Sequence, residues 1–125
     1  MAEKRMIYKC NECGNVIEVL HASGGKLICC GQDMELLQAN TVDAAVEKHV
    51  PVIEQEGDQV TVSVGSTPHP MEEKHYIEFI QLITEARTYT AYLDPGKPPK
   101  ASFDIRGEIE YARIYCNIHS LWKSS

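Results

Sequence analysis

Four of the five cysteines in this 125-residue chain lie within its first 30 positions, in a segment with few large apolar side chains. They are Cys10, Cys13, Cys29 and Cys30. A mini-domain of only ~40 residues seldom folds by apolar burial alone and usually needs a disulfide or a metal ion. An odd number of cysteines leaves one over in any disulfide framework. We therefore expect metal ligation or thiol chemistry here.

The spacing of the cysteines predicts a distorted tetrahedral site. Cys10 and Cys13 form a Cys-x-x-Cys turn that aims two thiolates at one ion, and Gly14 relieves crowding where the backbone doubles back. Cys29 and Cys30 supply the second pair, although adjacent residues of a regular strand point to opposite faces. Both bind one ion only if the backbone bends between them.

Short β-type segments separated by turn residues run through the rest of the chain and predict an all-β fold. In the first 36 residues we expect strands at 6–8, 16–20 and 27–31. Further on we expect strands at 50–53, 60–64, 88–93, 101–105 and 109–116. Residues 71–83 have both helical and strand character, and we favour a strand because their neighbours are strands.

Composition divides the chain into two domains and excludes some functions. We predict a four-cysteine domain at 1–36, a linker and active-site loop at 37–48 with a helical turn over 42–46, and a β-sandwich at 49–125. The net charge of −6 argues against nucleic-acid binding. The chain starts without an apolar signal core and has no run of ~18 apolar residues, so we expect a cytoplasmic protein that does not associate with membranes.

Four of the five histidines and the fifth cysteine lie beyond the linker, and their grouping suggests a second metal site. Cys116 and His119 share a Cys-Asn-Ile-His turn, and His69 and His75 lie on either side of a short loop. The fourth histidine of the group is His49. His21 stands apart, and we interpret it as a surface residue.

These motifs resemble known proteins. Cys-x-x-Cys followed by Cys-Cys resembles desulforedoxin, which holds one iron in a small β-domain. The segments 47–51, 69–77 and 116–119 resemble, in this order, the three metal-binding segments of desulfoferrodoxins, a family of superoxide reductases. The resemblance implies an immunoglobulin-like β-sandwich as the second domain. It also implies two iron ions per chain, one of them held by His49, His69, His75 and His119 with Cys116 as the axial ligand.

The same resemblance implies the reaction and the partners. Five ligands on an iron that prefers six leave one position open for substrate. Superoxide would be reduced there by one electron to hydrogen peroxide, and a donor such as rubredoxin would then re-reduce the iron. Lys48 would attract the anion, and Glu47 would occupy the sixth position of the ferric ion. The resemblance further implies a homodimer.

Two other classes of function are also compatible with these motifs. One is a non-enzymatic electron carrier with two irons, although a carrier does better with saturated ligation. The other is a zinc-based structural or interaction protein, which would be colourless. Apart from the family resemblance, Glu47 and Lys48 would be two solvated loop charges.

Overall fold

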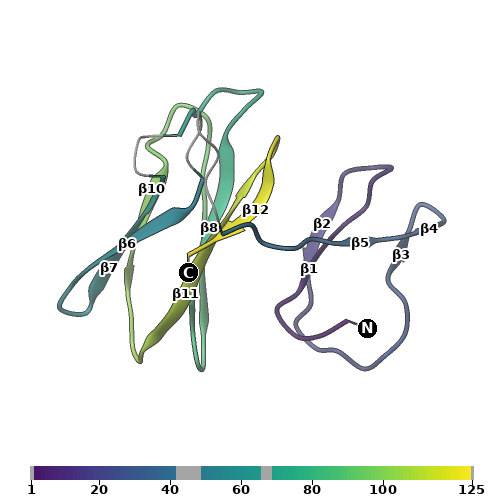
Figure 1. Cartoon of the computed structure of the whole chain (residues 1–125), viewed down its shortest axis with the longest axis horizontal. Helices are drawn as coiled ribbons and strands as arrows, with labels where there is room; N and C mark the ends of the chain where they lie inside the picture. The colour runs from purple at the N-terminus through teal and green to yellow at the C-terminus, as the bar shows by residue number, and fades with distance from the viewer. Residues whose placement is uncertain (1, 42–48, 66–68, 125) are drawn as a thin grey trace. The chain divides into compact units, whose positions relative to one another are not determined.

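The computed structural model describes residues 2–41, 49–65 and 69–124. Its contacts divide the chain into two compact units, Met1–Gln38 and Ala39–Ser125, each of which is described by itself. Within the described ranges the regular structure consists of strands, so the all-β prediction is confirmed (Figure 1). None of the described residues form a helix that is long and apolar enough to cross a membrane. The helical turn expected over 42–46 falls outside the described residues.

The first unit has very little apolar core. Its strands form a sheet in the order β2-β1-β5 and a separate hairpin of β3 and β4. The bounds are β1 (Ile7–Lys9), β2 (Val16–Glu18), β3 (Ile28–Cys29), β4 (Gln32–Asp33) and β5 (Glu35–Leu36). Its buried hydrophobic residues are Ile7, Tyr8, Cys10 and Val19. So small a core agrees with a fold that depends on a bound metal ion.

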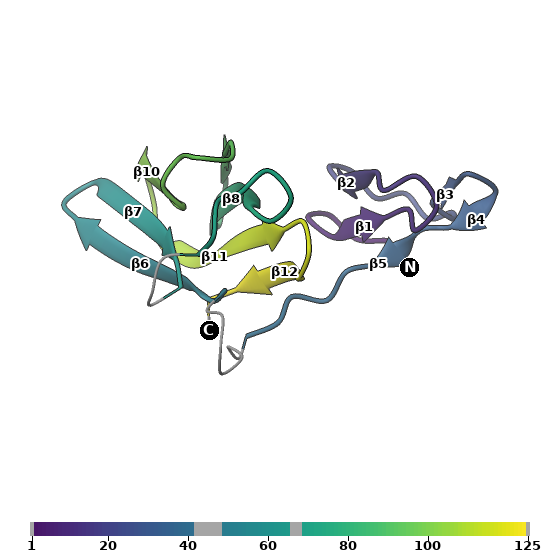
Figure 2. The same cartoon turned by 90° about the horizontal axis from the view of Figure 1, so that it is seen from above.

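The second unit is a sandwich of two antiparallel sheets, in the orders β10-β7-β6 and β12-β11-β8-β9. The two layers are seen in Figures 1 and 2. The bounds are β6 (Pro51–Glu56), β7 (Gln59–Val64), β8 (Ile77–Thr84), β9 (Thr88–Tyr92), β10 (Lys100–Asp104), β11 (Ile109–Cys116) and β12 (Ser120–Lys123). Strand β11 pairs with a neighbour on each side, since Ile114 lies opposite Ile80 of β8 and opposite Trp122 of β12.

Alternating side chains build the core between the sheets. In β7 the valines at 60, 62 and 64 are buried, and the residues between them are more exposed. They pack in one cluster with residues of β8 and β11, among them Leu82 and Ile114. Each such side chain contributes ~1.5–3 kcal/mol when fully buried. The period of two in residues 60–64 therefore gives β7 one face that packs into the core.

The prediction for residues 71–83 is correct only in its second half. β8 begins at Ile77, and the residues before it form a tight turn in which Glu72 and His75 exchange backbone hydrogen bonds of 2.9 and 3.0 Å. Glu72, Glu73 and Lys74 stay exposed in this turn, and residues 72–75 include no apolar side chain to bury. Strand β12 was not predicted, because four residues near the end of the chain carry too weak an alternation.

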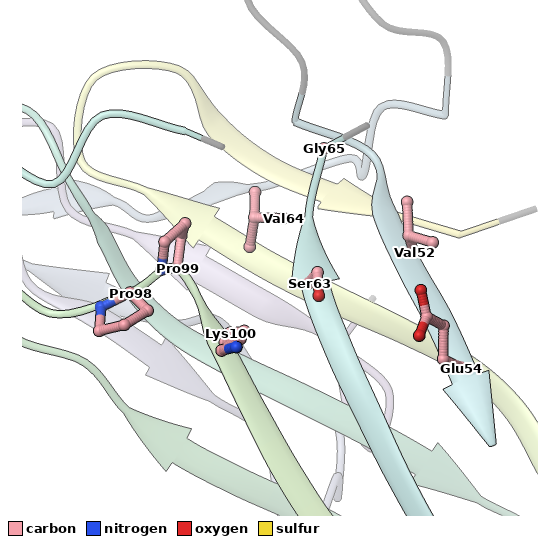
Figure 3. A pocket seen from close by; sticks show the side chains of 8 residues that line it. All are labelled: Val52, Glu54, Ser63, Val64, Gly65, Pro98, Pro99 and Lys100. Atoms are coloured by element: carbon pink, nitrogen blue, oxygen red, sulfur yellow. The ribbon is translucent and has the colours of Figure 1, made fainter. Parts of the chain in front are cut away.

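An open depression of about 640 Å³ lies over β6, β7 and β10 (Figure 3). It is lined by Val52, Glu54, Ser63, Val64, Gly65, Pro98, Pro99 and Lys100. Its lining contains neither histidine nor cysteine. The metal-ligating side chains are therefore found elsewhere in the fold.

Candidate metal centres

The four cysteines of the first unit converge as a tetrahedral ion requires. The Sγ atoms of Cys13 and Cys29 lie 3.7 Å apart, and those of Cys29 and Cys30 lie 3.9 Å apart. All four sulfur atoms are within 4.8 Å of one another, and none forms a disulfide. A tetrahedral ion ~2.3 Å from each sulfur sets neighbouring sulfurs ~3.8 Å apart. The cluster therefore fits one metal ion.

Two turns bring these sulfurs together. After β1 the chain folds back so that the N–H of Gly14 donates to the carbonyl of Cys10 at 2.9 Å, and Gly14 has a φ of 85°. At the second pair, Cys29 closes the β3–β4 hairpin and Cys30 has a φ of 54°. This left-handed residue is the bend that the adjacent pair required, and it turns the Cys30 side chain to the same side as that of Cys29.

Three thiols of this cluster have pKa values shifted by their neighbours. A hydrogen bond from the backbone N–H of Cys13 lowers the pKa of Cys10 to about 7. Hydrogen bonding with Cys10 raises the pKa of Cys29 to about 12, and hydrogen bonding with Cys13 raises the pKa of Cys30. A metal ion must displace the protons from these crowded sulfurs, so its affinity falls as the pH falls.

The second cluster gathers His49, His69, His75, Cys116 and His119 at one end of the sandwich. Their five ligand atoms lie within 4.8 Å of one another. The Nε2 atoms of His49 and His69 are 3.0 Å apart, which is the separation of adjacent ligands on an ion with bonds of ~2.1 Å. The Sγ of Cys116 lies 3.6 Å from Nε2 of His69 and 3.8 Å from Nδ1 of His119. These donors fit a transition-metal ion.

The four imidazoles contact one another in a closed ring. Going round the ring, His49 neighbours His69, His69 neighbours His75, His75 neighbours His119, and His119 neighbours His49. The centroid distances are 4.6, 4.8, 5.0 and 4.8 Å, with rings steeply inclined to each other. Four nitrogens around one point leave Cys116 as the fifth donor.

Strand ends position these side chains. His49 precedes β6, His75 precedes β8, and Cys116 is the last residue of β11. Because β8 and β11 are antiparallel, the start of β8 meets the end of β11, and Ile77 pairs with Cys116. The start of β6, in the other sheet, brings His49 to the same end of the sandwich. His69 is oriented through its other nitrogen, Nδ1, which donates to the carbonyl of Pro70 at 2.7 Å and leaves Nε2 directed at the cluster.

Burial differs across the cluster. Cys116 is fully buried, His49 and His69 are buried, and His75 is half-buried. His119 is exposed, as is its neighbour Ile118. Among the five residues, His119 is thus the most exposed and Cys116 is the most deeply buried.

Asn117 is a residue of the site that sequence reasoning missed. Its side chain accepts a hydrogen bond from the N–H of Tyr76 at 2.9 Å and donates one to the carbonyl of Lys74 at 3.0 Å. It thereby ties the segment that carries His75 to the loop between Cys116 and His119. Its place within the Cys-Asn-Ile-His turn was the available signal.

Replacing Asn117 by alanine should reduce the metal affinity of the second cluster ~10–100-fold, the usual cost of removing a group that orients a ligand. The four-cysteine cluster should keep its affinity. Chelator competition for Co²⁺ measures both sites in the same chain. Gln55→Ala, which removes an exposed amide that donates to the carbonyl of Gly57 and lies in neither cluster, is the control. Parental affinity in Asn117→Ala would show that the two hydrogen bonds do not position His75.

The remaining predicted residues separate into two groups. His21 is exposed and belongs to neither cluster, as expected of a surface residue. Glu47 and Lys48 lie outside the described residues, directly before His49. Their roles stay predictions.

The fold and the two clusters define a two-centre metalloprotein in which a small cysteine-ligated unit precedes a β-sandwich with a histidine and cysteine site. The desulfoferrodoxin family model matches residues 41–125, and the model of the desulfoferrodoxin N-terminal domain matches residues 2–37. The chain therefore belongs to the desulfoferrodoxin family. Its two clusters correspond to the two iron centres of that family.

Individual desulfoferrodoxins and superoxide reductases are also similar to this chain. A desulfoferrodoxin of Syntrophotalea carbinolica is 55% identical over 125 residues, covering 99% of this chain and 98% of that protein. A superoxide reductase of Thermococcus kodakarensis is 40% identical over 97 residues, covering 62% of this chain and 84% of that protein. The crystal structure of the superoxide reductase from Treponema pallidum matches with a TM-score of 0.82 at 28% identity, covering 96% and 97% of the two chains.

Proposed function

We propose that this protein is a superoxide reductase. The reaction takes one electron and two protons per superoxide and gives hydrogen peroxide, without the dioxygen that a dismutase releases. The observation that carries the proposal is the closed ring of four imidazoles with one buried thiolate, in a chain whose relatives include named superoxide reductases. The five residues would hold a ferrous ion, which would supply the electron.

The number of donors favours an enzyme over a carrier or a structural zinc site. A structural zinc site is closed by four ligands, whereas the five donors of this cluster would leave a metal that prefers six ligands with room for a substrate. Cys116 contributes a buried thiolate that donates electron density to the metal, as haem-thiolate enzymes do. The substrate approaches on the side of His119, the exposed member of the cluster.

Glu47 and Lys48 complete the proposed site as its catalytic residues. The protein has a formal charge of −6 and must admit an anion, so a cation beside the cluster is useful. Lys48 supplies that charge and helps to organise the protons. Glu47 would supply a carboxylate ligand to a ferric ion held by the cluster.

Lys48→Ala should slow the bimolecular reaction with superoxide by ~10-fold or more, because electrostatic steering is lost. The Debye length is ~8 Å at physiological salt, so added salt should slow the parent protein more than the variant. Time-resolved spectroscopy after a pulse of superoxide, at several ionic strengths, measures both effects. Glu47→Ala is the control, since it should alter the ferric spectrum without slowing encounter. An unchanged rate and salt dependence in Lys48→Ala would make Lys48 an ordinary surface charge.

The proposal includes a division of labour and partners. Residues 1–36 form the cysteine-ligated iron domain, 37–48 link it to the catalytic domain and carry the active-site loop, and 49–125 carry out the reaction. A rubredoxin-like protein re-reduces the iron. The protein acts in the cytoplasm as a homodimer.

The test of the function is product analysis. The ferrous protein is mixed with superoxide, and hydrogen peroxide and dioxygen are measured together with the iron content. We expect one peroxide per superoxide and no dioxygen above the spontaneous background. Dioxygen at half the superoxide consumed would indicate a dismutase, and an absence of accelerated superoxide loss would indicate an electron carrier.

A further inference from the structure

Trp122 touches two residues of the histidine and cysteine cluster with one side chain. Its indole stacks on the imidazole of His49, with centroids 4.7 Å apart and planes inclined by 16°. Its Nε1–H donates a hydrogen bond of 2.9 Å to the carbonyl oxygen of His119. Trp122 is 8% exposed, so both contacts are made inside the protein.

The stack limits the orientation of His49. The His49 ring already neighbours the rings of His69 and His119, in inclined arrangements with centroid distances of 4.6 and 4.8 Å. The indole covers one face of the same ring. Rotation of the imidazole about its bond to Cβ would carry its edge into the indole, since stacked rings at this separation are in van der Waals contact. The stack therefore holds Nε2 of His49 toward the cluster.

The hydrogen bond fixes the turn that carries His119. Cys116 pairs with Ser120 across a three-residue loop, and Ser120 has a φ of 72°. A buried indole N–H needs an acceptor, and here the carbonyl of His119 provides it three residues away. The contact determines where the main chain of His119 lies, and so the 3.8 Å approach of its Nδ1 to Cys116.

The backbone of Trp122 is itself held on both sides. On one side it pairs with Ile114 of β11. On the other it forms a parallel bridge with Asn40, whose N–H donates to Leu121 and whose carbonyl accepts from Lys123, both at 2.9 Å. The indole is thus presented from a rigid strand, as an orienting group requires.

We infer that Trp122 is a positioning residue of the second metal centre, which orients His49 by stacking and His119 by a hydrogen bond. The inference depends on the cluster binding a metal ion and not on the proposed reaction with superoxide. Groups that orient ligands tune both the affinity and the electronic properties of a metal centre.

Two variants separate the contacts, and a third is the control. Trp122→Phe keeps an aromatic ring on His49 and loses the N–H donor, whereas Trp122→Leu loses both. Phe103→Leu removes a half-buried aromatic that packs against the core near Tyr89. Phe103 pairs with Val60, at the opposite end of β7 from the histidine and cysteine cluster. This variant reproduces the loss of an aromatic from the sandwich without touching a ligand.

Two readouts are taken on the full-length chain. Chelator competition gives the Co²⁺ affinity of the histidine and cysteine site, with the four-cysteine site as an internal reference. Redox titration of the iron-loaded chain gives the midpoint potential of each centre. Thermal unfolding of all variants reports the general cost to stability.

We expect Trp122→Leu to lower the Co²⁺ affinity of the second site ~10–100-fold and to raise its iron midpoint potential, since weaker donation disfavours the ferric ion. Trp122→Phe should fall between the parent and Trp122→Leu in both readouts. Phe103→Leu should lower the unfolding temperature and leave affinity and potential unchanged. The four-cysteine site should stay at parental values throughout.

Parental affinity and potential in Trp122→Leu would overturn the inference, as would equal losses in Phe103→Leu. Should Trp122→Leu fail to fold, Trp122→Phe decides alone: lowered affinity with a shifted potential supports the inference, and parental values overturn it. Failure of the superoxide reaction in the parent protein would affect the proposed function and leave these measurements intact.

Discussion

Cys116→Ser should lower the metal affinity of the second centre by more than ~10–100-fold. That range is typical of residues that orient a ligand without binding the metal, whereas Cys116→Ser replaces a ligand atom itself. A serine hydroxyl is a hard, weakly donating group in place of a soft thiolate. Cys116 is fully buried at the end of β11. We expect loss of the thiolate-to-iron absorption of the second centre and of the reaction with superoxide.

The measurements are iron content, visible spectrum and superoxide decay. The control is Val62→Thr, which also introduces a hydroxyl into the same core at a fully buried position away from the cluster. A buried hydroxyl without a partner costs ~1–3 kcal/mol, and Val62→Thr isolates that effect on folding. A parental spectrum and rate in Cys116→Ser would show that Cys116 is not a ligand.

Cys13→Ser should remove the first iron and spare the second. The first unit has few buried apolar residues, and a structural metal ion contributes on the order of 10 kcal/mol to a fold of this kind. We expect the unit Met1–Gln38 to lose its metal and become open to proteases, while Ala39–Ser125 stays folded. Iron should fall from two to one per chain, and superoxide reduction should persist, because each proposed catalytic residue lies at or beyond Glu47.

Limited proteolysis, metal analysis and pulsed superoxide measure these effects on one sample. Cys116→Ser is the converse variant, since it should keep the first iron and lose the second. The division of labour would be refuted by a Cys13→Ser chain that retains the iron of the histidine and cysteine centre but does not react with superoxide.

The sequence by itself determined the local chemistry of both centres. Cys10 and Cys13 are close enough in the chain for one turn to join their sulfurs, and adjacent Cys29 and Cys30 required the left-handed bend that Cys30 adopts. The alternation in 60–64 likewise predicted β7, because a strand with one buried face has a period of two. Such features depend on residues that are neighbours in sequence.

Tertiary structure decided what depends on pairing between distant strands. The order of the imidazoles around the ring appears only when the folded sandwich brings His49, His75 and His119 to one end, and no spacing in the sequence contains it. Asn117 and Trp122 received no role from the sequence, because their partners Tyr76 and His49 lie 41 and 73 residues away in the chain. Hydrogen bonds and ring stacking over such separations exist only after the sandwich has formed.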